Sequence, residues 1–110
     1  MKKFRNIGDT ETISAFPGHY RRTLTANNEI MFCVFNMDKG TRVELHNHAA
    51  AQIGYIIRGE MEFFDKDGNT VLGGPGFSYV FDPYEIHGCA AVTDCEFVEA
   101  FTPSRPEYDN

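Results

Sequence analysis

The sequence lacks the features that would place it in several broad classes of protein. It has no tryptophan, no sustained helical periodicity and no apolar run close to the length of a membrane-spanning helix. Positive charge is also in short supply, because ten lysines and arginines face sixteen aspartates and glutamates and the net charge is −6. Nucleic acids and anionic membranes attract clustered positive charge. We therefore expect neither as a partner, and we expect an anionic ligand to need positive charge within its own site.

Cysteine is scarce as well. Cys33, Cys89 and Cys95 are odd in number and form no C-x-x-C pair, which is typical of buried reduced thiols rather than of disulfides or a zinc site. The basic residues at the start of the chain precede no apolar stretch. The sequence therefore predicts no signal peptide and a cytoplasmic location.

What the sequence does contain is a series of short strand-like runs separated by turn residues. Residues 1–110 are predicted to form a single domain, in which an N-terminal arm over residues 1–18 could add an edge strand. Strands are predicted at 19–25, 29–37, 61–65, 70–72, 77–81, 85–91 and 95–101, with another pair around residues 43–57. This pattern indicates an all-β sandwich or barrel.

Three details of this pattern can be checked against a structure. The run over 29–37 is almost continuously apolar, which is typical of a strand buried on both faces. Asp67-Gly68-Asn69 is predicted to turn a hairpin. Pro103 and Pro106 are expected to hold the C-terminal tail extended.

Two of the four histidines lie one residue apart. Because side chains on a strand alternate between its faces, His46 and His48 are predicted to project the same way, which is a metal-ligand pattern. A chance pair of solvent-facing histidines is the alternative. A second segment, from Gly76 to His87, starts at a glycine and ends in a turn and a third histidine, which makes chance a poor explanation. His19 lies outside both segments and is interpreted as a structural or exposed histidine.

These two segments resemble the two motifs of the cupin family, G-x5-H-x-H-x3,4-E-x6-G and G-x5-P-x-G-x2-H-x3-N. The first motif is matched at every spacing by Gly40, His46, His48 and Gly59, with Gln52 at the position of the usual Glu. In the second motif Gly76 and His87 match, whereas Asp82, Tyr84 and Ala91 replace Pro, Gly and Asn. The resemblance implies a double-stranded β-helix of jelly-roll type, that is, a small β-barrel.

Three imidazoles and the amide oxygen of Gln52 would together hold one divalent first-row transition metal, such as Ni, Fe, Mn, Zn or Co, with positions open for a small molecule. The predicted metal ligands are therefore His46, His48, Gln52 and His87. Glutamine in place of glutamate removes one negative charge, which favours an anionic ligand. In the alternative interpretation, Gln52 is a strand residue hydrogen-bonded to the backbone.

The C-terminal stretch adds a second group of candidate residues. Glu99 and Phe101 share one face of the last predicted strand, and Arg105 follows a proline-stiffened turn. A proton-transfer group, an apolar wall and a carboxylate-binding cation could therefore border one pocket. The alternative is that Glu99 is an exposed acid, Phe101 a core residue and Arg105 a solvated tail charge.

Together, the two groups resemble the small cupins of pectin and alginate breakdown, the KdgF type. In that group an Asp, a Phe and an Arg at these separations act on the substrate. Phe101 and Arg105 match, Glu99 replaces the Asp, and Ala49 to Ala51 departs from the expected Pro-His-Glu. The resemblance implies that Glu99, Phe101 and Arg105 are catalytic.

The reaction that this resemblance implies is a metal-dependent conversion of 4,5-unsaturated uronates, small anionic sugar acids, to linear 4-deoxy-5-keto uronates. It needs only proton transfers and no redox cofactor. The alternatives are another metal-cupin enzyme, such as a dioxygenase, and a non-catalytic sugar-acid sensor. Cupins of this size commonly pair, so we also expect a homodimer.

Overall fold

The computed structural model describes residues 3–109, so the first two residues of the predicted N-terminal arm lie outside the described part. The described residues form ten strands and two short 3-10 helices. The strands are β1 Ile13–Phe16, β2 His19–Ala26, β3 Met31–Met37, β4 Arg42–His46, β5 Ala51–Arg58, β6 Met61–Phe64, β7 Thr70–Gly73, β8 Ser78–Phe81, β9 His87–Ala91 and β10 Cys95–Thr102, and the helices are η1 Ile7–Asp9 and η2 Pro106–Tyr108.

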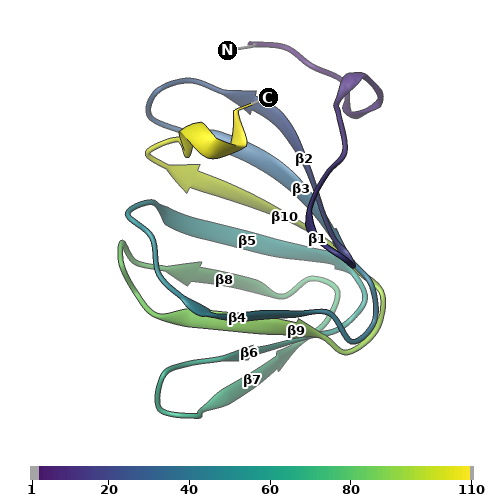
Figure 1. Cartoon of the computed structure of the whole chain (residues 1–110), viewed down its shortest axis with the longest axis vertical. Coiled ribbons are helices and arrows are strands. Elements are labelled where there is room, and N and C mark those ends of the chain that lie inside the picture. Colours follow the sequence, from purple (N-terminus) through teal and green to yellow (C-terminus); the bar gives the residue numbers. More distant parts are fainter. Residues whose placement is uncertain (1–2, 110) are drawn as a thin grey trace.

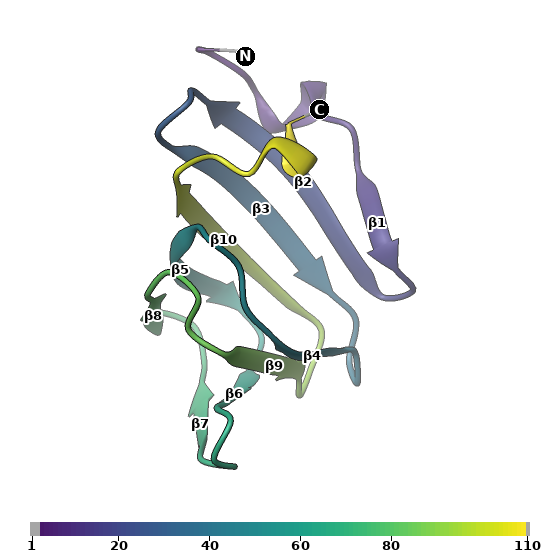
Figure 2. The same cartoon turned by 60° about the vertical axis from the view of Figure 1, so that its left-hand side comes forward.

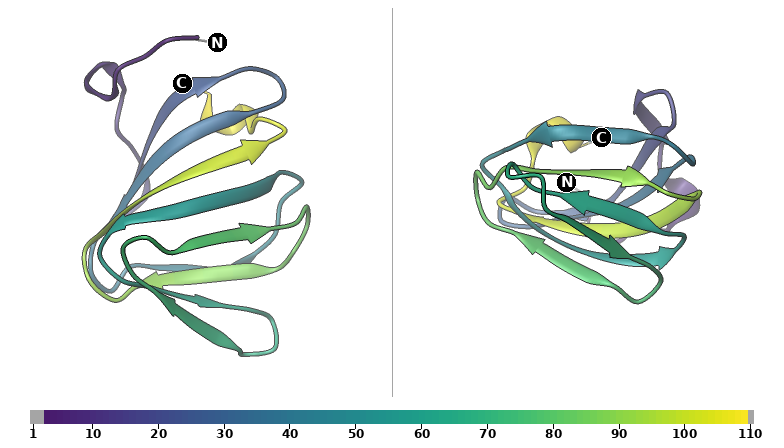
Figure 3. Two further views of the ribbon diagram at one scale, coloured as in Figure 1. Left: turned by 180° about the vertical axis from the view of Figure 1, so that it is seen from behind. Right: turned by 90° about the horizontal axis from the view of Figure 1, so that it is seen from below.

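The strands form two antiparallel sheets that curve towards each other (Figures 1 and 3). The larger sheet has the order β1-β2-β3-β10-β5-β8, and the smaller sheet has the order β4-β9-β6-β7. Neighbours such as β3 and β10 are far apart in sequence, as a jelly roll requires. The predicted all-β jelly-roll fold is confirmed. No helix among residues 3–109 has the length and apolar character needed to cross a membrane.

Alternating burial along the strands of the larger sheet directs one set of side chains into the space between the sheets. In β10 the buried positions alternate with half-buried ones, and Phe97 and Phe101 point into the core. They pack with Phe35, Ile56 and Met61, which are all under a tenth exposed. Polar residues are buried on the same inner face, at the places where a pocket opens. They are His19, Arg21 and Thr23 of β2, Gln52 of β5 and Glu99 of β10.

The structure corrects the prediction for the apolar strand over 29–37. β3 begins at Met31, and Ile30 and Phe32 are 51% and 38% exposed. The strand lies between β2 and β10, so one of its faces points outward from the sheet. The inward face of this strand is fully buried, whereas its outward face is buried only in part, at Val34.

Both ends of the described chain are attached to the larger sheet (Figure 2). β1 pairs with β2 and forms the sheet edge. The tail is not extended as predicted, because Pro106 begins η2, and proline suits the first position of a helical turn. The Tyr108 carbonyl accepts hydrogen bonds from Thr23 Oγ1 at 2.6 Å and from Arg21 at 3.0 Å. These bonds hold the tail beside β2.

The hairpin predicted at Asp67-Gly68-Asn69 is confirmed, since β6 and β7 pair on either side of it. The Asp65 carboxylate accepts hydrogen bonds from the backbone nitrogens of Asp67 and Asn69 at 2.9 and 3.0 Å. Together with the backbone hydrogen bond from Asp65 to the carbonyl of Asn69 at 3.1 Å, these bonds close the turn.

Candidate metal centre and pocket

Three histidines converge between the two sheets. His46 ends β4 and His87 begins β9, and the two are cross-strand partners. His48 lies two residues beyond the end of β4, so it is not part of that strand. Its imidazole nevertheless projects to the same point as that of His46, as predicted. One ligand nitrogen from each ring lies within 4.8 Å of the other two.

Each imidazole is oriented by a backbone carbonyl close to it in sequence. The Nδ1 atoms of His46, His48 and His87 lie 2.8, 2.7 and 2.7 Å from the carbonyl oxygens of residues 44, 50 and 85. A carbonyl oxygen can only accept, so Nδ1 carries the proton in each ring. The Nε2 atoms are then the unprotonated nitrogens, which is the tautomer a metal ligand needs.

Two of these nitrogens have no hydrogen-bond partner inside the described part of the protein. Nε2 of His48 and Nε2 of His87 are both buried and make no hydrogen bond. Burial lowers the pKa of His87 to about 4 and also lowers the pKa of His48, where the nearby charge of Arg105 adds to the effect. Neutral imidazoles with unpaired nitrogens facing one point fit a divalent transition metal.

The turn before His87 forms despite its departures from the cupin motif. Tyr84 stands where the motif has Gly, and it adopts the left-handed conformation, with φ 63°, that glycine favours. Its backbone nitrogen donates to the carbonyl of His48 at 2.8 Å, and the nitrogen of Glu85 donates to the carbonyl of Asp82. The turn thus ties the second histidine segment to the first.

Gln52 lies on the inner face of β5 and is buried. Its Nε2 donates to Glu99 Oε2 at 3.0 Å, so its partner is a side chain rather than the backbone group of the alternative interpretation. The amide oxygen remains as the only metal-binding atom that Gln52 can offer. The predicted ligand role of Gln52 is compatible with this orientation and stays a prediction.

Glu99 is a buried acid, not the exposed one of the alternative interpretation. It is 7% exposed, and burial raises its pKa to about 7, against the opposing effects of Tyr79, Arg105 and Gln52. The Tyr79 hydroxyl donates to Glu99 Oε2 at 2.5 Å. A carboxyl group with a pKa near neutrality can both accept and release a proton at physiological pH.

Arg105 is not a solvated tail charge. Its side chain is 16% exposed, and its guanidinium carbon lies 4.1 Å from the ring centroid of Tyr108 and 5.2 Å from that of Phe101. Glu107 offers a long contact of 3.5 Å. Contact with the two aromatic rings restricts the guanidinium position, and its N–H groups are suited to bind a carboxylate.

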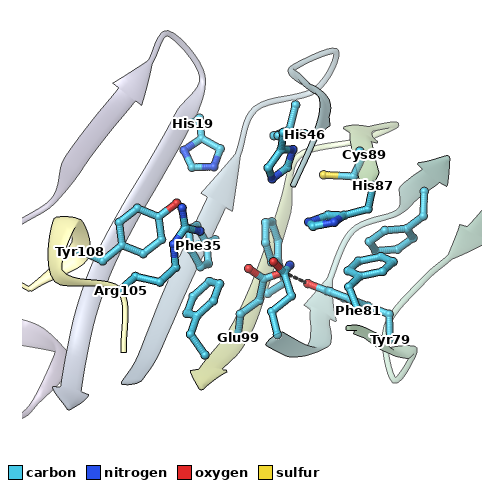
Figure 4. A pocket seen from close by; sticks show the side chains of 16 residues that line it. His19, Phe35, His46, Tyr79, Phe81, His87, Cys89, Glu99, Arg105 and Tyr108 are labelled. Carbon is cyan, nitrogen blue, oxygen red and sulfur yellow. Dashed lines mark hydrogen bonds between the residues drawn. The ribbon is translucent and has the colours of Figure 1, made fainter. Parts of the chain in front are cut away.

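Most of these side chains line one pocket that opens to solvent (Figure 4). Among the predicted site residues, the lining includes His46, Gln52, His87, Glu99, Phe101 and Arg105. His48, the remaining member of the histidine group, lies next to the pocket. Its ring centroid is 6.2 Å from that of Phe101. Every predicted site residue therefore lies at or next to this pocket.

The pocket lining also includes residues that were not predicted, among them His19, Tyr79 and Tyr108 with their polar side-chain groups. His19 is 9% exposed, its Nδ1 is buried without a partner, and its ring stacks on Phe16. The alternation of His19 with Arg21 along β2 could have indicated a shared face. The intervening residues are also polar, however, so the sequence does not say which face is buried.

Comparison with known proteins agrees with the fold and the histidine motif. The model of the cupin domain family matches residues 33–101, so the chain belongs to the cupin family. A sequence comparison with curated proteins finds no significant match.

Solved structures of cupins cover nearly the whole chain. An RmlC-like cupin from Shewanella frigidimarina is 27% identical, with a TM-score of 0.91 over 99% of this chain and 97% of its own. KdgF from Halomonas sp. is 24% identical, with a TM-score of 0.87 over 97% and 98%. The polyketide cyclase RemF from Streptomyces resistomycificus is 23% identical, with a TM-score of 0.80 over 96% and 82%. The protein is thus a small cupin similar in structure to KdgF.

Proposed function

We propose that this cupin is an enzyme that opens 4,5-unsaturated uronates and converts them to linear 4-deoxy-5-keto uronates. One observation carries the proposal: a single small pocket brings together three converging imidazole nitrogens, a carboxyl group with a pKa near neutrality and a guanidinium held against an aromatic ring. A uronate is a sugar ring that carries hydroxyl groups and an acid group, and these are chemically complementary to the side chains of the pocket. The reaction is an isomerisation, so no atoms are added and no electrons leave.

In the proposed reaction a base removes the proton of the anomeric hydroxyl, and the bond between carbon 1 and the ring oxygen breaks. Carbon 1 becomes an aldehyde. The ring oxygen becomes the keto group at carbon 5 as the 4,5 double bond takes up a proton at carbon 4. Glu99 can accept the first proton in its ionised form and return it at carbon 4, because its pKa near 7 makes both forms accessible.

The remaining side chains bind and orient the substrate in this proposal. Arg105 pairs with the substrate carboxylate through the edge of its guanidinium. Phe101 packs against the sugar ring, and it also supports the stack of Arg105. The unpaired Nδ1 of His19 is available to a sugar hydroxyl.

We also propose that His46, His48, Gln52 and His87 hold one divalent first-row ion. When bound, such an ion supplies Lewis acidity to substrate oxygens. The neutral rings and the unpaired Nε2 atoms support this assignment. The amide of Gln52 adds no negative charge, which suits an anionic substrate.

The similarity to KdgF supports the choice of substrate class. At 24% identity that similarity by itself concerns the fold. The support comes from Phe101 and Arg105, which stand at the positions expected in the KdgF type and line the pocket together. Glu99 is one methylene longer than the usual Asp, and it bonds to Gln52 and Tyr79.

The test is turnover of 4,5-unsaturated uronates prepared from pectin and from alginate, followed by loss of their ultraviolet absorbance. Metal-loaded protein is expected to exceed the spontaneous rate for at least one substrate. A rate equal to the spontaneous one for both substrates would contradict the proposal. In that case, oxygen consumption would indicate a dioxygenase, and tight uronate binding without turnover would indicate a sensor.

A further inference from the structure

Three residues from neighbouring strands form one row across the inner face of the larger sheet. Glu99 of β10 is the cross-strand partner of Gly54 of β5, and Gly54 is in turn the partner of Tyr79 of β8. Side chains two strands apart in such a row are normally separated by the side chain between them. Here the middle position is a glycine, so nothing separates Glu99 from Tyr79.

Gly54 is needed for space rather than for backbone conformation. It lies inside β5 and is not among the glycines with positive φ. A Cβ atom built on it would lie 2.1 to 2.5 Å from atoms of the Tyr79 phenol. The ring of Tyr79 therefore lies over Gly54, and its hydroxyl reaches the carboxyl group on the far side.

Two donors converge on one oxygen of Glu99. The hydroxyl of Tyr79 donates to Oε2 at 2.5 Å, and Nε2 of Gln52 donates to the same atom at 3.0 Å. Oε1 is the oxygen that neither donor occupies. Figure 4 shows the Tyr79 contact beside the pocket, with Arg105 on the opposite side of Glu99.

This arrangement is costly for folding. A buried hydroxyl and a buried carboxyl group each lose hydration, and the hydrogen bond between them offsets only part of that penalty. Burial and Glu99 raise the pKa of Tyr79 far above its usual value, so the side chain stays a hydrogen-bond donor at neutral pH. A costly contact next to a pocket indicates a functional role more than a structural one.

We propose that Tyr79 is a positioning residue, which occupies Oε2 of Glu99 across Gly54 and thereby presents Oε1 to the substrate for proton transfer. This inference rests on the proposed function. It adds a residue that lies inside the second histidine segment but is neither a predicted metal ligand nor part of the C-terminal stretch.

The first test is Tyr79→Phe, which removes the hydroxyl and keeps the ring. Losing one hydrogen bond to an ionisable group is expected to lower kcat roughly 10- to 100-fold. KM and metal content are expected to stay unchanged, because Tyr79 contacts neither the substrate nor the histidines in this assignment. The matched control is Tyr55→Phe, on the outward face of β5 and 49% exposed, which should leave all three quantities unchanged.

The second test does not depend on turnover. The infrared carboxyl band of Glu99, assigned by its loss in Glu99→Gln, is expected to shift in Tyr79→Phe and to stay in place in Tyr55→Phe. An unshifted band in Tyr79→Phe would overturn the inference whatever the activity. If the band shifts and the wild type is active, but Tyr79→Phe has the same kcat as the wild type, the positioning role in catalysis is wrong. If the band shifts and the wild type is inactive, the proposed function fails and the hydrogen-bonded arrangement of Glu99 stands.

Discussion

The two sides of the pocket are built in different ways. The histidine group, His46, His48 and His87, is oriented by carbonyls two residues away in sequence. The acid wall, which we define as Glu99, Tyr79 and Arg105, depends on distant segments. Glu99 bonds to residues 20 and 47 positions away, and the tail that carries Arg105 is held through bonds spanning 85 and 87 positions.

This difference separates two kinds of variant. A change in the histidine group should abolish metal binding if, as we propose, each ring is a ligand that no other residue can replace. A change in the acid wall should alter substrate binding or turnover while the metal stays bound. The variants below test whether metal binding depends on the histidine group alone and turnover on the acid wall.

The largest effect is expected for His87→Ala. Purified wild-type protein should carry close to one divalent ion per chain, and the variant should carry almost none by elemental analysis. His19→Gln is the matched control, because His19 borders the same pocket but belongs to neither group. Full metal content in His87→Ala, or loss of metal in His19→Gln, would contradict the ligand assignment.

The second effect concerns the stability of metal-free protein. Because burial raises the pKa of Glu99 from 4.5 to about 7, the unfolded chain releases this proton before the folded one does. The stability that Glu99 contributes is therefore present below pH 4.5 and is lost as the pH rises towards 7. Relative to wild type, Glu99→Gln should gain up to about 3 kcal/mol in its free energy of unfolding between pH 4.5 and pH 8. Urea unfolding at both pH values tests this, and a pH-independent difference would argue against the raised pKa.

Arg105→Ala should act mainly on binding. A charge-assisted contact with a carboxylate is made in the ground state and the transition state alike, so KM should rise roughly 10- to 100-fold with little change in kcat. Arg58→Ala, on an exposed arginine that pairs with Glu96, is the control. An unchanged KM in Arg105→Ala would remove Arg105 from the substrate site.

The smallest effect is expected for Tyr84→Gly. Glycine relieves the left-handed conformation at this turn, and it also adds freedom to the unfolded chain. The two contributions oppose each other, so the free energy of unfolding should change by less than about 1 kcal/mol. Metal content should not change. Loss of metal in this variant would mean that the tyrosine side chain itself supports the histidine group.

The same contrast explains how much of the site the sequence could predict. The histidine group was predictable because its spacing is local and its rings are held by nearby backbone. The two imidazoles of His46 and His48 project the same way as predicted, although β4 ends at His46 and His48 follows it. The all-β fold followed from short alternating runs, which depend on the same local periodicity.

The acid wall was predictable only in part. Glu99, Phe101 and Arg105 were found through their resemblance to the KdgF type. Tyr79 was not, because its contact with Glu99 requires the pairing of β10, β5 and β8 and the missing side chain of Gly54. No sequence window contains that row. The cytoplasmic location and the homodimer stay predictions.

The most direct test of the two-sided pocket is the turnover of Glu99→Gln, measured on protein whose metal content is known. Glutamine keeps the size of the side chain and removes the proton-transfer group. We expect kcat to fall roughly 10²- to 10⁴-fold, towards the spontaneous rate, while metal content stays near one ion per chain. Wild-type turnover in metal-loaded Glu99→Gln would contradict the account, because proton transfer would then not depend on the acid wall.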